Sequence, residues 1–130
     1  MTLRRSLTLA IALVALLATG PAAAADDRRP PRTMLHLTIA AEFGVTADAM
    51  LTCGPAGGSH PNAGAACAEL AGVSGDLDRL PGKPQQLCTM QYQPVTAAAH
   101  GHWRGKVVAW ERVFSNRCAL QAATGSVFRF

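Results

Sequence analysis

Four cysteines and four histidines are the residues of this 130-residue chain best suited to bind a metal ion. Zinc takes thiolate and imidazole ligands, and zinc sites commonly present two of them a few residues apart. The chain has no Cys-x-x-Cys and no His-x-x-x-His pair, and His100 and His102 share at most one face of a strand. We therefore expect neither a metal site nor a cofactor.

No serine stands out as a catalytic nucleophile, because the run GVSG at residues 72–75 lacks the G-x-S-x-G spacing and is typical of a helix end. Four residues on neighbouring predicted strands could instead supply a general acid, a general base and a phosphate contact: His100, His102, Glu111 and Arg112. A small secreted ribonuclease is therefore the alternative function. The formal net charge of +4 falls to +2 without Arg4 and Arg5 of the first 25 residues, and the sequence has no Lys/Arg cluster, so we expect no nucleic-acid partner.

The segment LCTMQYQP at residues 87–94 places a large apolar side chain, Met90, among polar neighbours. Pro84 and Pro94 stiffen the two ends of this segment. A rigid, extended loop with one apolar anchor suits binding in a protease cleft, where extended backbone pairs with strands and one deep pocket supplies much of the affinity. The alternative is that Met90 fills a gap in the core, and composition alone favours it.

The N-terminus has the pattern of a secretory signal peptide over residues 1–25. Two arginines precede an apolar run that is too short to span a membrane, and small residues then mark a cleavage site. Residues 26–33, DDRRPPRT, follow as a loose tail, and residues 34–130 form one domain. We expect a secreted, extracellular protein without a membrane partner.

An even number of cysteines in an exported chain predicts two disulfides and no free thiol. Four cysteines allow three pairings, and the sequence alone does not choose between them. Sequential pairing, Cys53 with Cys67 and Cys88 with Cys118, is the simplest because each bridge then closes its own loop.

The elements that must position these residues follow from periodicity. Alternation predicts strands over residues 35–39, 45–53, 95–103, 106–114 and 126–130, with the last one closing the sheet. Residues 53–61 are predicted to form a loop, residues 63–70 a helix, residues 76–80 one further turn and residues 116–121 a short second helix. This order predicts an α+β domain in which helix packs on one face of an antiparallel sheet.

Several motifs and the order of the four cysteines closely resemble those of one family. They are Thr52-Cys53-Gly54-Pro55, His60-Pro61, Ala66-Cys67-Ala68-Glu69-Leu70, Gly75-Asp76-Leu77, Cys88-Thr89-Met90-Gln91-Tyr92, Pro94-Val95, Trp103-Arg104-Gly105-Lys106, Glu111-Arg112-Val113-Phe114-Ser115-Asn116, Arg117-Cys118 and Ser126-Val127-Phe128. Over nearly all of residues 35–130 the chain resembles the Streptomyces subtilisin inhibitor family of secreted protease inhibitors.

The resemblance implies a five-stranded antiparallel sheet with two helices, the sequential disulfide pairing, and a homodimer formed through the sheet. It also places His36 near the dimer contact. The reactive bond is implied to be Met90–Gln91, and Asn116 matches the residue whose side-chain amide braces the loop. The implied protease-contacting residues are Gln85, Gln86, Leu87, Cys88, Thr89 and Tyr92, of which residues 85–87 would add as a strand to the protease.

The implied mechanism is inhibition of subtilisin-like serine proteases by a loop that enters the active site as a substrate does. Met90 would fill the primary specificity pocket. A large apolar side chain suits the pocket of subtilisin-like enzymes, whereas trypsin-like enzymes hold a buried carboxylate there that awaits a cation. The resemblance therefore favours an inhibitor over an enzyme.

Overall fold

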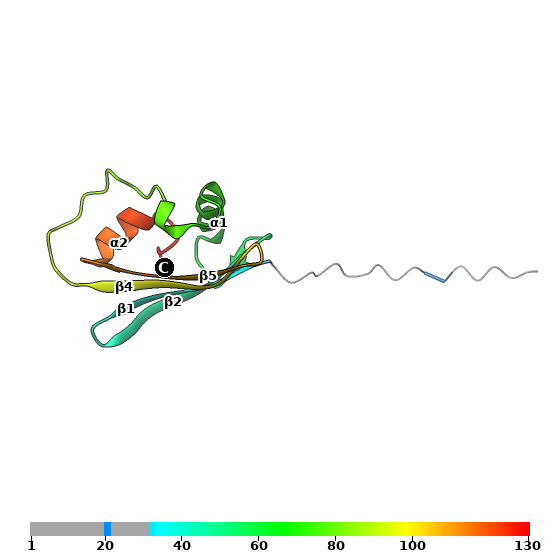
Figure 1. The fold of residues 1–130 in the computed structure, drawn as a ribbon, viewed down its shortest axis with the longest axis horizontal. Helices are drawn as coiled ribbons and strands as arrows, with labels where there is room; N and C mark the ends of the chain where they lie inside the picture. Colours follow the sequence, from blue (N-terminus) through cyan, green and yellow to red (C-terminus); the bar gives the residue numbers. More distant parts are fainter. Residues whose placement is uncertain (1–19, 22–31) are drawn as a thin grey trace, which may run out of the picture.

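The computed structural model describes residues 20–21 and 32–130 (Figure 1). The predicted signal peptide and tail lie almost entirely outside those residues. The described chain forms a five-stranded antiparallel sheet in the order β3-β2-β1-β4-β5. In chain order the elements are β1 (Thr33–Ala41), β2 (Gly44–Cys53), β3 (Gly57–Gly58), helix α1 (Ala63–Gly72), the 3₁₀ turn η1 (Leu77–Arg79), β4 (Val95–Trp103), β5 (Lys106–Phe114) and helix α2 (Arg117–Thr124).

The central strand β1 shows why the sheet has one buried and one open face. Leu35, Leu37 and Ile39 are fully buried on one face, whereas Met34 and His36 are exposed on the other. This is the period of two that a half-buried strand requires. β1 pairs with β2 on one side and with β4 on the other, so the three long strands share this division into faces.

Both helices cover the same face of the sheet, as Figure 1 shows. Ala66 and Leu70, four residues apart on α1, are fully buried, and α2 contributes Leu120 to the same core. Among the described residues, no helix has the length and apolar character needed to cross a membrane. The predicted α+β class, with two helices on one face of a five-stranded antiparallel sheet, is confirmed.

The prediction of a last strand over residues 126–130 is wrong. Val127 and Phe128 are adjacent in sequence and both are fully buried, whereas a strand would point them to opposite faces. The N–H of Val127 donates to Thr124 O and the N–H of Arg129 donates to Ser126 O, so the segment is held by local turns rather than by a ladder. The fifth strand is instead β3, which pairs with β2 inside the segment predicted to be a loop.

Two predicted boundaries also move. β1 begins at Thr33, which was assigned to the tail, because its side chain is buried and its hydroxyl accepts a hydrogen bond from Arg104 N at 3.0 Å. The second helix runs to Thr124 rather than to residue 121. The Thr124 hydroxyl is buried and donates back to Leu120 O at 2.8 Å, which satisfies it inside the helix.

Candidate functional site

The segment between η1 and β4 contains no helix or strand and presents large apolar side chains to solvent. Met90 is 99% exposed, Leu87 is 96% exposed and Tyr92 is 77% exposed. In Figure 1 this segment is the yellow-green trace that leaves the helical layer and runs around one end of the sheet to β4. Met90 therefore fills no gap in the core, and that alternative is wrong.

Asn116 joins this loop to the start of α2. It is the N-cap of the helix, and its side-chain oxygen accepts a hydrogen bond from Ala119 N at 2.8 Å. This contact turns the amide nitrogen toward the loop, where it donates to Gln91 O at 2.8 Å and Thr89 O at 3.3 Å. The two carbonyls flank Met90, so one side chain holds the backbone on both sides of the Met90–Gln91 bond.

The disulfide between Cys88 and Cys118 adds a covalent tie from the same helix, with the two Cα atoms 5.7 Å apart. Together with Asn116, it anchors the loop to one turn of α2. The second disulfide joins Cys53 of β2 to Cys67 of α1, well away from the loop in sequence. The structure thus has the sequential pairing that the family resemblance implies, and no cysteine is free.

Main-chain contacts fix the two ends of the loop, and sequence reasoning missed them. At the first end, Lys83 N donates to Ala122 O at 2.7 Å. A Cβ on Gly82 would lie 2.2 Å from that same oxygen, so the residue must be glycine for the loop to approach α2. At the second end, Gln93 N donates to Ser115 O at 2.9 Å. The only sequence feature near these contacts is the pair Pro81-Gly82, which predicts a turn but not its approach to α2.

Residues 85–87, which are predicted to add as a strand to the protease, differ in their exposure and in their hydrogen bonds to the rest of the fold. Gln85 is exposed, whereas Gln86 is partly buried and its N–H donates to Lys83 O at 2.9 Å. The side-chain oxygen of Gln86 also accepts from Arg129 at 3.4 Å. Gln86 therefore belongs to the support of the loop, and the strongly exposed part of the segment begins at Leu87.

The four residues of the ribonuclease hypothesis are divided between the two faces of the sheet. His100 and His102 lie on the open face of β4, and Glu111 lies on the open face of β5. Arg112 follows Glu111 in the same strand and points to the opposite face, with its guanidinium 5.3 Å from the centre of the Phe114 ring.

Within residues 20–21 and 32–130, no group of three or more His, Cys, Asp or Glu side chains is placed to hold a metal ion.

Comparison with known proteins shows the family to which the chain belongs. The family model described as subtilisin inhibitor-like matches residues 31–116. The chain belongs to the subtilisin inhibitor-like family. This is a family of protease inhibitors rather than enzymes, so the resemblance found in the motifs is confirmed.

Relatives in the family are similar over most of the described chain. The subtilisin inhibitor of Streptomyces albogriseolus is 49% identical over 94 residues, which are 72% of this chain and 62% of that protein. The subtilase-type protease inhibitor of Streptomyces coelicolor is 39% identical over 123 residues, covering 94% of this chain and 85% of that protein. The crystal structure of Streptomyces caespitosus sermetstatin in complex with Bacillus licheniformis subtilisin matches with a TM-score of 0.64 and 34% identity, over 75% of this chain and 97% of sermetstatin.

Proposed function

We propose that this chain inhibits subtilisin-like serine proteases by presenting the Met90–Gln91 bond to the active site as a substrate would. The observation that carries the proposal is the pair of hydrogen bonds from Asn116 to the carbonyls of Thr89 and Gln91. Ordinary substrate segments are free to leave once they are cut. A bond braced on both sides, beside a side chain that is 99% exposed, has the form of an inhibitory loop.

The Asn116 hydrogen bonds and the Cys88–Cys118 disulfide explain inhibition because they hold the two new chain ends together after cleavage. The catalytic serine attacks the Met90 carbonyl carbon while the carbonyl oxygen lies in the oxyanion hole. The bond breaks to give an acyl-enzyme at Met90 and an amine on Gln91, and water then hydrolyses the acyl-enzyme to a Met90 carboxylate. The first fragment stays tied to α2 through Cys88 and the Thr89 carbonyl, and the second through the Gln91 carbonyl. The two ends are therefore held close together, and resealing competes with release.

An inhibition assay with the oxidised protein and subtilisin tests this function. We expect stoichiometric loss of protease activity on a chromogenic peptide. Mass spectrometry of the complex after long incubation should find a single cut, between Met90 and Gln91. Rapid cleavage at several sites without loss of protease activity would show that the loop is an ordinary substrate.

Replacing Asn116 with alanine should leave the fold nearly intact and make the loop easier to hydrolyse. A side-chain hydrogen bond contributes about 1 kcal/mol net, and loss of a helix cap costs about as much. The melting temperature should therefore fall by only a few degrees, while subtilisin cuts the variant several-fold faster than the parent. Asn116→Asp is the matched control for the cap, because it keeps the acceptor for Ala119 N but loses the donor to the loop. Equal hydrolysis of all three proteins would remove Asn116 from the mechanism.

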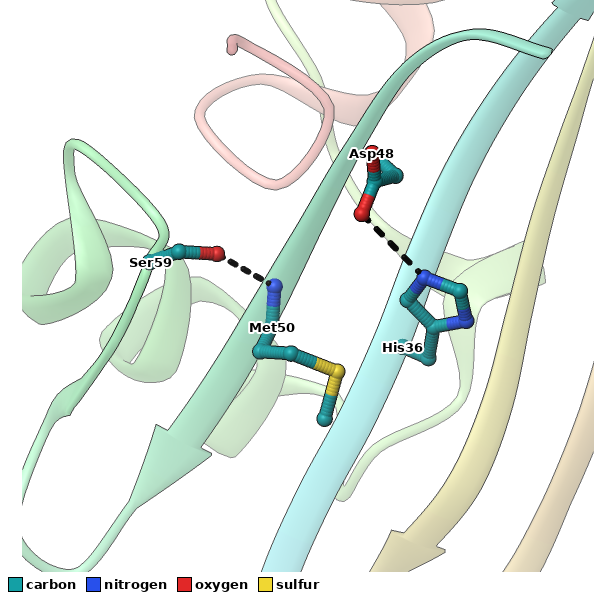
Figure 2. Close-up of polar contacts among 4 residues, drawn as sticks. All are labelled: His36, Asp48, Met50 and Ser59. Carbon is teal, nitrogen blue, oxygen red and sulfur yellow. Dashed lines mark hydrogen bonds and ion pairs between the residues drawn. The ribbon is translucent and has the colours of Figure 1, made fainter.

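The homodimer is also a proposal, and the open face of the sheet supports it. Met34 and Met50 lie on this face, and Met34 is 44% exposed despite being apolar. Figure 2 shows His36 beside Met50 on this face. The Nε2 atom of His36 lies 3.4 Å from Asp48 Oδ2. A second copy of the chain would cover these side chains, whereas the helices already cover the opposite face.

Such a dimer should weaken as the pH falls, because three histidines share the open face. His36 lies opposite His100 across β1 and β4, and His102 is two residues further along β4. Histidine is the side chain whose charge commonly changes between pH 5 and 8, and Asp48 and Glu111 on the same face offset only part of the positive charge that three protonated histidines would add. We expect a larger monomer fraction at pH 5 than at pH 8 by sedimentation. The doubly substituted His36→Gln, His100→Gln protein should lose most of this difference, and a parent dimer that is equally stable at both pH values would exclude the histidines from the interface.

We also propose that the protein is secreted. The N-terminal pattern of a signal peptide over residues 1–25 and two disulfides both suit an extracellular protein. Expression of the full chain in a bacterium with a general secretion pathway should release a protein that starts near Asp26. N-terminal sequencing of the secreted product tests this cleavage site.

A further inference from the structure

Phe43 is 98% exposed at the tip of the β1–β2 hairpin, and the fold gives no reason for an aromatic residue there. The backbone requirement of the turn is met by Gly44, whose φ of 111° is one that glycine adopts readily. The Phe43 side chain adds nothing to the core. A large apolar side chain held in water by a rigid hairpin is typical of an interaction surface.

The strand register places this tip beside the reactive loop. Ala41 pairs with Gly44 at the end of the hairpin, and Ala40 pairs with Thr96 at the start of β4. The chain runs directly from the reactive bond into β4, so only four residues lie between Gln91 and Thr96. In Figure 1 the hairpin tip and the end of the reactive loop lie at the same end of the sheet.

A groove of about 770 Å³ lies between the hairpin and the loop, and Phe43 and Tyr92 both line it. Its lining also includes the apolar residues Pro94 and Val95, while Glu42 and Arg117 bring one charge of each sign. Tyr92 is the second residue after the proposed reactive bond. The groove is therefore continuous with the surface that a bound protease would contact.

We propose that Phe43 and Tyr92 form a second contact surface for the same protease, on the side of its cleft that receives residues after the cut bond. This inference rests on the proposed function of the loop. The five steps from Gln91 to Thr96, the partner of Ala40, span at most about 17 Å, and a domain of about 250 residues has a radius of gyration of about 18 Å. A protease seated on the Met90–Gln91 bond is therefore large enough to reach the hairpin tip, and its surface should be apolar where it meets Phe43.

The test is the inhibition constant of the full oxidised protein with Phe43→Ala, measured against subtilisin. We expect inhibition about tenfold weaker than that of the parent, with most of the change in the dissociation rate. The melting temperature should not change, because the Phe43 side chain makes almost no contacts in the free protein. Val45→Ala is the matched control: it removes an exposed apolar side chain, 63% exposed, from the same hairpin but outside the groove. It should inhibit as the parent does.

The outcomes separate this inference from the function on which it rests. A parent that inhibits subtilisin, with a Phe43→Ala variant within twofold of it, overturns the second contact and leaves the proposed function standing. A parent that does not inhibit removes both. If Phe43→Ala changes the sedimentation of the free protein but not its inhibition constant, the residue belongs to a contact between copies, which also overturns the inference. Coupling between Phe43→Ala and Tyr92→Ala in a double-mutant cycle would support a shared surface.

Discussion

Replacing Met90 with lysine should move inhibition from subtilisin-like toward trypsin-like proteases. The ammonium group would meet the buried carboxylate of a trypsin-type pocket, whereas in a subtilisin-type pocket it would be desolvated without a partner. Met90→Gly should weaken inhibition of subtilisin by about 2–4 kcal/mol, as for a side chain that is the main anchor of an interface. Met90→Asp should be worse than glycine against both classes.

None of the three Met90 variants should alter thermal stability, because the side chain is 99% exposed in the free protein. Inhibition constants against subtilisin and trypsin, with melting temperatures of the same samples, measure both effects. A buried methionine cut to glycine would instead cost about 2–5 kcal/mol of stability. Unchanged selectivity in the lysine variant would place the reactive bond at another residue.

Loss of the Cys88–Cys118 disulfide should convert the inhibitor into a substrate. With both cysteines replaced by serine, the loop keeps the Asn116 hydrogen bonds but loses its covalent tie to α2, so after cleavage the new end at Met90 can move away from Gln91 while the rest of the fold stays assembled. In the chain-entropy model the bridge also stabilises the fold by about 3–4 kcal/mol. A fall in inhibition could therefore reflect either the loop or the fold.

The other disulfide is a matched control for this effect. Replacing Cys53 and Cys67 with serine removes a bridge between β2 and α1 that closes a somewhat shorter loop, worth about 3 kcal/mol, and leaves the reactive loop untouched. Assays well below both melting temperatures should find rapid cleavage at Met90–Gln91 in the first variant and near-parental inhibition in the second. Similar behaviour of the two variants would mean that overall stability, and not the tie at Cys88, limits hydrolysis.

Several features of this protein follow from its sequence alone. Alternation in residues 35–39 predicts the central strand because each side chain in a strand faces either the core or the solvent. The even number of cysteines indicates two disulfides. The position of Met90, among polar residues and between prolines, marks an unusual loop, but composition alone favours the core for this side chain, and only the structure shows that it is exposed.

Contacts between distant segments required the tertiary structure. Alternation at residues 126–130 predicted a strand, but the core takes up Val127 and Phe128 together from an irregular chain, and β3 forms from two glycines whose composition suggests only a loop. The anchoring of the loop through Ala122 and Ser115 uses main-chain carbonyls, which every residue carries and no sequence pattern marks. The proximity of Phe43 to Tyr92 likewise depends on the register of β1 with β2 and β4, because strand pairing is a property of the assembled sheet and not of any one segment.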